Sequence, residues 1–309
     1  MKIAIVGTGG VGGYYGARLA QSGNDVTFIA RGAHLEAIKQ KGLQIKSPLG
    51  DYKVFPVKAT DTPAEAGRVD LIIFVTKTYQ TDRAVEMIKP IIGKDTVIVP
   101  LQNGVDAAER IGLAVGMERM IGGATWMSAA VEEPGVIGHY SQFSRIAIGE
   151  LNGKETPRLK AIFDLIHASG VTVEMTDNIL KVLWTKFVFI SPISAMGCLT
   201  RVTLGEYRAV PEARKILLEA IKEVAAVGRA RGVALDADVV EKTLKFIDTG
   251  APGIKPSIQR DVEGGKLSEL ESMIGALVRM GELQNVPTPV LGMAYAMLKP
   301  RELLAQQAN

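Results

Sequence analysis

The sequence predicts an α/β domain built on a parallel sheet, residues 1–176, followed by an all-α domain, residues 177–309. Two observations carry this prediction. The chain opens with a β-branched segment that runs directly into a glycine-rich turn and a helical pattern, and from residue 178 onward the hydrophobic periodicity is helical almost throughout. A chain of 309 residues is also long enough for two domains of ordinary size.

Composition narrows the class of protein. Hydrophobic residues make up 47% of the chain and charged residues 22%, as in a soluble globular protein. A net charge of +3 without a run of Lys or Arg gives no basis for nucleic-acid binding. No segment reaches the ~20 uninterrupted apolar residues of a membrane span, and the N-terminal apolar run is too short for a signal peptide. We therefore expect a cytoplasmic protein that binds neither nucleic acid nor a membrane.

Metal and disulfide chemistry are not indicated. The single cysteine, Cys198, excludes an internal disulfide framework and a zinc site built on several cysteines. We expect it to be a small core residue, and we name no metal ligands.

The N-terminal strand and turn are typical of nucleotide binding. Residues 2–6, KIAIV, precede GTGGVGG, which has the G-x-G-x-x-G spacing, and a second strand, DVTFIA, follows at the right distance. Such glycines permit a tight turn, let the backbone approach a pyrophosphate and let the helix pack against the strand. We therefore predict a Rossmann dinucleotide-binding domain. The residues expected to bind the cofactor are Gly7, Thr8, Gly9, Gly10, Val11 and Gly12.

The end of the second strand indicates which dinucleotide binds. An NAD site places Asp or Glu there to accept hydrogen bonds from the adenosine ribose, but this chain has Arg31, nineteen residues after Gly12. A guanidinium can hold a 2′-phosphate with two hydrogen bonds, whereas a carboxylate would repel it. We therefore predict NADPH as the cofactor. Lys77, at the end of the strand LIIFVTK, could add a second positive charge near that phosphate.

Further strand-like segments follow at 97–104 and 120–131, and residues 135–150 alternate as antiparallel strands would. The first of these segments ends at Asn103-Gly104. An Asn-Gly pair is most often a simple turn. At the ligand-binding edge of a parallel sheet, however, the amide of Asn103 could also bond the nicotinamide or a substrate oxygen, and both readings stay open.

The second domain is expected to be helical at 178–200, 211–231, 236–248, 255–262, 267–284 and 288–298, with a frayed tail, LLAQQAN. Its first helix carries Lys186 inside the run VLWTKFVFI. At ~100° per residue, every position within about 60° of Lys186 is apolar. Pro192 should kink the helix beside it. A desolvated lysine has its pKa lowered toward neutrality, which suits a general acid that protonates an alkoxide.

A second group of candidates lies in KPSIQRDVEGGKLSELE, residues 255–271. Ser257 and Asp261 stand at helical spacing, and Glu269 opens the next predicted helix. From spacing alone Glu269 is either a surface carboxylate or a member of the site.

These residues together resemble the ketopantoate reductase (2-dehydropantoate 2-reductase) family over essentially the whole chain. The resemblance lies in IVGTGGVGG, Arg31, VTKTYQ, QNG, LWTKF, GEYR and PSIQRDVEGGKLSELE, in this order. It implies an N-terminal Rossmann domain with a helical C-terminal domain and NADPH-dependent reduction of a 2-oxo acid. It also implies that Lys186 is the catalytic proton donor, that Glu269 is the carboxylate at substrate and cofactor, and that Asn103 lies beside the nicotinamide.

The resemblance implies further contacts. Arg31 and Lys77 would lie on the NADP side, Ala129 would contact the cofactor through its backbone, and Ser257 would contact the substrate. The best-known members carry asparagines four and eight residues after the lysine and another beyond the helix; this chain has Ile190, Ser194 and Leu204 there. We expect Ile190 and Ser194 to line a more apolar substrate site, suited to a bulkier or less hydroxylated keto acid.

The predicted function is reduction of 2-dehydropantoate to (R)-pantoate in pantothenate (vitamin B5) biosynthesis. One alternative is a 2-hydroxy acid dehydrogenase of the same family that acts on another 2-oxo acid, and a second is a non-catalytic NADPH-binding sensor. Histidine-based chemistry is disfavoured because none of the three histidines stands in a recognisable pairing with Asp or Arg. The predicted partners are a small-molecule 2-oxo acid and, through the apolar helices, a second copy in a homodimer.

Overall fold

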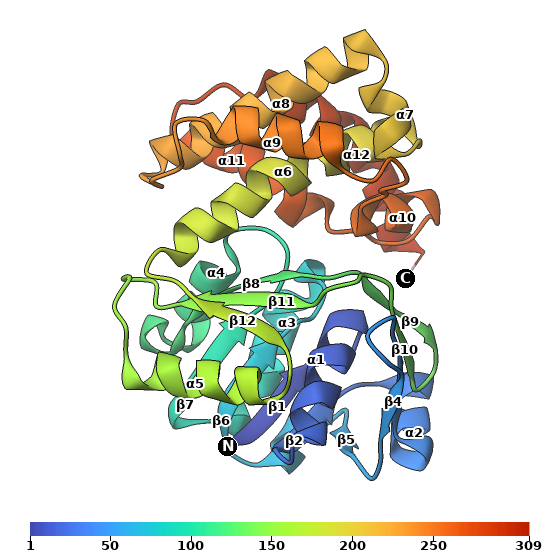
Figure 1. The fold of residues 1–309 in the computed structure, drawn as a ribbon, viewed down its shortest axis with the longest axis vertical. Coiled ribbons are helices and arrows are strands. Elements are labelled where there is room, and N and C mark those ends of the chain that lie inside the picture. Colours follow the sequence, from blue (N-terminus) through green and yellow to red (C-terminus); the bar gives the residue numbers. More distant parts are fainter. Residues whose placement is uncertain (309) are drawn as a thin grey trace. The chain divides into compact units, whose positions relative to one another are not determined.

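The structure is a computed structural model that describes residues 1–308. Its chain forms two compact units (Figure 1). The first comprises Met1–Gln102 and Ala107–Ile179, and the second comprises Asn103–Asp106 and the chain from Leu180 onward. The expected boundary lay between residues 176 and 177, and residues 103–106 were expected in the first domain. They belong to the second unit because Asn103 bonds Glu269 there and Gly104 lies against the backbone of Ser272.

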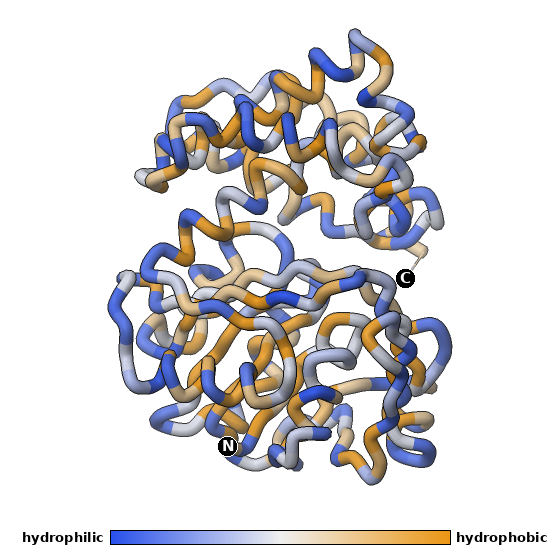
Figure 2. Tube along the Cα trace, viewed as in Figure 1, coloured by the Kyte–Doolittle hydropathy of each residue, from blue (hydrophilic) through white to orange (hydrophobic). Residues whose placement is uncertain are grey.

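A parallel sheet forms the centre of the first unit, with strand order β5-β2-β1-β6-β7. Every pairing in it is parallel, which confirms the predicted Rossmann-type sheet. Alternate residues of its strands point to opposite faces, and both faces are buried at the central strands β1 and β6, so these two are almost entirely apolar. Figure 2 shows hydrophobic residues in orange along these strands. The strands are β1 (Lys2–Val6), β2 (Asp25–Ile29), β5 (Lys58–Thr60), β6 (Val69–Phe74) and β7 (Ile92–Pro100).

Helices cover the two faces of this sheet. Ile3 and Ile5 share a core with α1 and α5, whereas Ala4 and Val6 share a second core with α3 and α4. These two layers are the doubly wound arrangement that parallel sheets require. The helices are α1 (Gly10–Gln21), α2 (Gly32–Lys41), α3 (Thr81–Ile88), α4 (Ala107–Val115) and α5 (Pro157–Ala168), with short 3₁₀ turns η1 (Pro63–Ala66), η2 (Thr78–Gln80), η3 (Lys89–Ile91) and η4 (Met117–Arg119).

Two smaller sheets complete the first unit. One has the order β4-β3-β10-β9 and the other β12-β11-β8. The segment 120–131 therefore forms two strands in different sheets. The antiparallel character expected over 135–150 is present, but β10 pairs with β9 and β11 with β8 rather than with each other. The strands are β3 (Leu43–Lys46), β4 (Tyr52–Val54), β8 (Gly122–Trp126), β9 (Ala129–Glu133), β10 (Val136–His139), β11 (Arg145–Gly149) and β12 (Thr172–Met175).

Every secondary-structure element in the described part of the second unit is helical, as predicted. The last helix continues to Gln307, so the expected frayed tail is wrong through that residue. One turn, Glu271–Gly275, is π-helical. The helices are α6 (Ile179–Thr200), α7 (Leu204–Arg208), α8 (Pro211–Ala230), α9 (Val239–Thr249), α10 (Ser257–Glu263), the π turn η5, α11 (Ala276–Leu283) and α12 (Pro289–Gln307).

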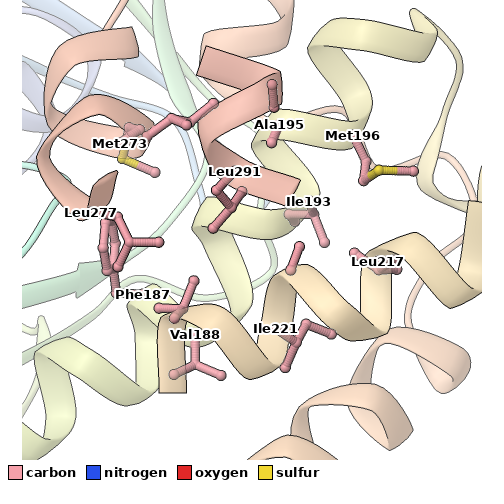
Figure 3. Packing of buried hydrophobic residues seen from close by; sticks show 14 of the residues in the cluster. Phe187, Val188, Ile193, Ala195, Met196, Leu217, Ile221, Met273, Leu277 and Leu291 are labelled. Atoms are coloured by element: carbon pink, nitrogen blue, oxygen red, sulfur yellow. The ribbon is translucent and has the colours of Figure 1, made fainter. Parts of the chain in front are cut away.

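The core of the second unit forms around α6. Phe187, Val188 and Ile193 of this helix pack with Leu217 and Ile221 of α8 (Figure 3). Residues 191–198 of α6 are all buried, so this half of the helix is enclosed on every side, including at Ser191 and Ser194. The helix continues through Pro192, so the proline does not end it.

Among the described residues, α6 is the one helix long and apolar enough to span a membrane. About two thirds of its apolar window, 67%, is buried inside the protein, as in the core helix of a soluble protein.

Candidate active site

The glycine loop between β1 and α1 is shaped by close backbone contacts. Gly7 has a φ of +102°, a region that favours glycine, and a Cβ there would lie 2.7 Å from the backbone nitrogen of Thr76. A Cβ on Gly12 would lie 2.1 Å from the carbonyl oxygen of Gly7, and one on Gly10 would lie 2.4 Å from the carbonyl of Ala129. A Cβ on Gly9, in contrast, has no described atom within 4 Å. Three of the four glycines are therefore in close contact with neighbouring backbone, and only Gly9 leaves open space where a Cβ would stand.

The other residues predicted to bind the cofactor lie near the carboxyl ends of β2 and β6. The buried hydroxyl of Thr8 donates to the carbonyl of Ile29 at 3.0 Å, so it anchors the loop to β2 and is already engaged within the protein. Arg31, just beyond β2, is exposed, and the described residues offer its side chain no hydrogen-bond or ionic partner. Lys77 follows the segment that contacts Gly7. Val11, Lys77 and Ala129 are half-buried.

The first unit therefore contains most of the residues predicted for the cofactor: the glycine loop, Arg31, Lys77 and Ala129. Asn103 and Glu269, also predicted to contact the cofactor, belong to the second unit. Gln102 was not singled out from the sequence. Its Nε2 donates to the carbonyl of Thr76 at 2.8 Å and to the Thr81 hydroxyl at 3.0 Å, so it ties the end of β7 to the loop after β6.

In the second unit three predicted side chains meet. The amine of Lys186 donates to Oδ1 of Asn103 at 3.2 Å, and Nδ2 of Asn103 donates to Oε2 of Glu269 at 3.4 Å. An amide can make both bonds in one orientation only, because its oxygen accepts and its nitrogen donates. Asn103 therefore connects the ammonium to the carboxylate. We call these three residues the lysine–amide–carboxylate set.

Local backbone geometry positions the set. Gly104 has a φ of +96°, and a Cβ there would lie 3.3 Å from the carbonyl oxygen of Ser272, so the turn after Asn103 lies close to the π-helical turn. The buried hydroxyl of Ser191, on α6, donates to the carbonyl of Met273 in the same turn at 2.6 Å. Glu269 immediately precedes this region and is only 5% exposed. Such π-helical turns are frequent at functional sites.

Burial changes the chemistry of the lysine. It lowers the pKa of Lys186 from 10.5 to about 8, and the negative charge of Glu269 partly offsets this decrease. At pH 7 the amine is then about 90% protonated. Such an amine can give a proton and recover it near neutral pH, which an ordinary lysine does far less readily.

The other residues predicted to contact the substrate differ from one another in burial. Ile190 and Ser257 are half-buried, and no bond of the Ser257 hydroxyl occurs among residues 1–308. Ser194 is fully buried, and its hydroxyl has no described partner. Leu204 is a core residue. This half of α6 is buried, so no surface of Ser194 is exposed, and its expected substrate contact stays a prediction.

One feature near the set was missed from the sequence. The rings of Phe189 and Phe246 meet edge to face, with centroids 5.0 Å apart. Phe246 lies off the buried stripe of α9, which runs through Val239, Thr243 and Ile247. An aromatic residue off such a stripe is the signal that could have identified it.

No group of three or more His, Cys, Asp or Glu side chains in residues 1–308 could hold a metal ion. Cys198 is buried, and burial raises its pKa to about 12, so the thiol stays protonated near neutral pH.

Comparisons with known proteins cover both units. The family model "Ketopantoate reductase PanE/ApbA" matches residues 3–153, and "Ketopantoate reductase PanE/ApbA C terminal" matches residues 178–302. An uncharacterized oxidoreductase, YkpB of Bacillus subtilis, is 32% identical over 98% of this chain and 99% of its own.

Two solved structures share the fold. The 2-dehydropantoate 2-reductase of Geobacter metallireducens has a TM-score of 0.91 and 31% identity, covering 97% of this chain and 99% of its own. A D-mandelate dehydrogenase in a ternary structure with NADH and anilino(oxo)acetate has a TM-score of 0.88 and 26% identity, covering 99% of this chain and 100% of its own.

Proposed function

Since the chain belongs to the ketopantoate reductase family, we propose that it reduces a small 2-oxo acid with NADPH, and that 2-dehydropantoate is its first candidate substrate. The product would be (R)-pantoate, in the biosynthesis of pantothenate. At the coarser level the protein is an oxidoreductase of the 2-hydroxy acid dehydrogenase type found in that family. The observation that carries the proposal is the bonded lysine–amide–carboxylate set with its lowered lysine pKa.

The first unit fits a dinucleotide. The open space at Gly9, in a loop otherwise packed by backbone contacts, suits a pyrophosphate at the start of α1. Arg31 is exposed and has no partner in the described chain, so it can hold a 2′-phosphate. NADPH, when bound, supplies the hydride that the keto carbon accepts. The D-mandelate dehydrogenase of similar fold was solved with NADH, so the preference for NADPH rests on the positive charges predicted near the 2′-phosphate, chiefly Arg31.

The second unit supplies the proton. Lys186 bonds the keto oxygen, stabilises the negative charge that develops on it, and donates the proton that completes the hydroxyl group. Asn103 holds the amine in position through the 3.2 Å hydrogen bond, which limits the geometries that Lys186 can adopt. Glu269 keeps a negative charge near the ammonium and so favours its protonated form.

The test is a panel of 2-oxo acids, in which loss of NADPH absorbance is followed with and without each acid. We expect turnover of 2-dehydropantoate in the wild-type protein and not in Lys186→Met. Tight NADPH binding without reduction of any acid would instead support the non-catalytic sensor.

A second candidate is reduction of another 2-oxo acid. Ile190, one turn after Lys186, is half-buried and cannot hydrogen-bond a substrate hydroxyl. A site built to bond a hydroxyl rejects the analogue without it by a factor of about 10⁴ or more. The matched pair is 2-dehydropantoate and 3,3-dimethyl-2-oxobutanoate, which differ by that hydroxyl group. A kcat/KM that is equal for the two, or higher for the second, would favour the other acid.

The expected homodimer stays a prediction. Its measurement is the mass of the protein in solution by analytical ultracentrifugation.

A further inference from the structure

An apolar surface lies next to the lysine–amide–carboxylate set. Phe189 and Ile190 follow Lys186 by three and four residues, so they flank it on the same side of α6, about 5–6 Å away between Cβ atoms. Both side chains are only half-buried. The polar groups of the set therefore meet apolar side chains within one helical turn.

Phe246 extends this surface from a second helix. Its ring is 57% exposed, although burying such a side chain is favourable. It contacts Phe189 edge to face, an arrangement that aromatic rings prefer and that holds the two rings in a defined geometry. The exposed ring is thus connected through Phe189 to the turn of α6 that carries Lys186. An exposed apolar surface beside a polar reactive group is typical of a ligand site.

The side chains that form this surface, Phe189, Ile190 and Phe246, carry no hydrogen-bonding group. Ile190 stands where the resemblance leads one to expect an amide, and Val105, beside the Asn103 turn, packs against the same core. Burying an apolar substituent of a ligand against such a surface is favourable, whereas a hydroxyl group buried there would have no hydrogen-bond partner.

We propose that Phe246 and Phe189 form the subsite for an apolar substituent on the carbon next to the keto group, and that Phe246 is a specificity-determining residue. The preferred substrates are then 2-oxo acids in which this carbon is aromatic or fully branched. This inference rests on the proposed reduction of a 2-oxo acid, and it adds which side chain of the acid is recognised and by which residues.

The test compares two substrates that differ in that substituent, phenylglyoxylate and pyruvate, in Phe246→Ala and Phe246→Leu. In Phe246→Ala we expect kcat/KM for phenylglyoxylate to fall about 10- to 100-fold, chiefly through KM, because a ring loses its apolar contact. The loss for pyruvate should be much smaller, and Phe246→Leu should lie between wild type and Phe246→Ala. Leu283→Ala is the matched control, because Leu283 is 75% exposed in the same unit and lies outside the set.

A binding measurement separates this inference from the proposed function. Calorimetry with anilino(oxo)acetate and with oxamate, which lacks the ring, needs no turnover. Phe246→Ala should weaken the first ligand at least tenfold and hardly change the second. Equal changes for both ligands, or no change for either, would overturn the subsite. Failure of the wild-type protein to reduce any 2-oxo acid would overturn the proposed function, while the calorimetry would still decide on the subsite.

Discussion

The glycine loop of the first unit and the lysine–amide–carboxylate set of the second unit work by different means. The loop is contiguous in sequence, residues 7–12, and offers backbone shaped by contacts that a Cβ would block. The set joins side chains 83 and 166 residues apart and depends on the chemistry of each one. The loop therefore needs glycine at positions 7, 10 and 12, whereas the set needs three particular functional groups.

The two regions also differ in electrostatics. Loop backbone carries only partial charges, which the first turn of a helix directs toward an anion. The set holds full charges, and burial of the Lys186 amine lowers its pKa to about 8 although the negative charge of Glu269 partly offsets this decrease. Substitutions in the loop should therefore act on binding and stability, and substitutions in the set on turnover.

The largest expected effect is that of Lys186→Met. Loss of the proton donor should lower kcat by about 10³-fold, or about 4 kcal/mol, because general acid catalysis contributes on this scale. NADPH affinity should stay within about twofold of wild type. Stopped-flow absorbance and a fluorescence titration measure the two quantities.

Lys181→Met is the control for that substitution, since Lys181 lies on the same helix and is paired with Asp236. If Lys186→Met kept kcat within tenfold of the wild-type value, the catalytic role of this lysine would be refuted.

The pH dependence of reduction is the next largest effect. Lys186 is active when protonated, so kcat should be constant below its pKa of about 8 and should fall tenfold per pH unit above it. At pH 10 this amounts to about a 100-fold loss. A pH profile of kcat at saturating substrate measures it; a profile flat to pH 10 would place the proton donor elsewhere.

Within the glycine loop, Gly10→Ala tests whether the close backbone contact at this position excludes a side chain. Its Cβ would lie 2.4 Å from the Ala129 carbonyl, so the first unit should lose about 1–3 kcal/mol of unfolding free energy, measured by urea denaturation. Gly9→Ala is the matched control. No described atom lies within 4 Å of its Cβ, so stability should hardly change while NADPH binding weakens. Similar destabilisation in both variants would contradict the contrast between the two glycines.

The smallest effect is expected from Arg31→Ala. Losing a guanidinium from a 2′-phosphate should weaken NADPH about 10- to 30-fold and leave NADH unchanged, as measured by fluorescence titration. Arg68→Ala is the control, since Arg68 is an exposed arginine that precedes β6, at the opposite end of the strands. Equal losses for the two cofactors would remove the basis for predicting NADPH.

Much of the fold could be predicted from the sequence because its signals are local. The glycine spacing after KIAIV predicted the parallel-sheet domain, and the helical periodicity from residue 178 predicted the helical domain. The structure confirms both predictions. The sequence did not predict that residues 120–131 divide into β8 and β9. The sheet that a strand joins depends on its pairing partners, which are distant in sequence. The burial of Ser194 escaped prediction for the same reason.

The sequence by itself determined the dinucleotide-type loop and singled out Lys186. Both signals are visible over a few residues: one is a turn that requires glycine, and the other is a charged residue among apolar neighbours. Only the tertiary structure decided that Asn103 belongs with the helical unit, that it bonds Lys186 and Glu269, and that Phe246 contacts Phe189. These are contacts between distant segments, and their geometry depends on how whole helices pack.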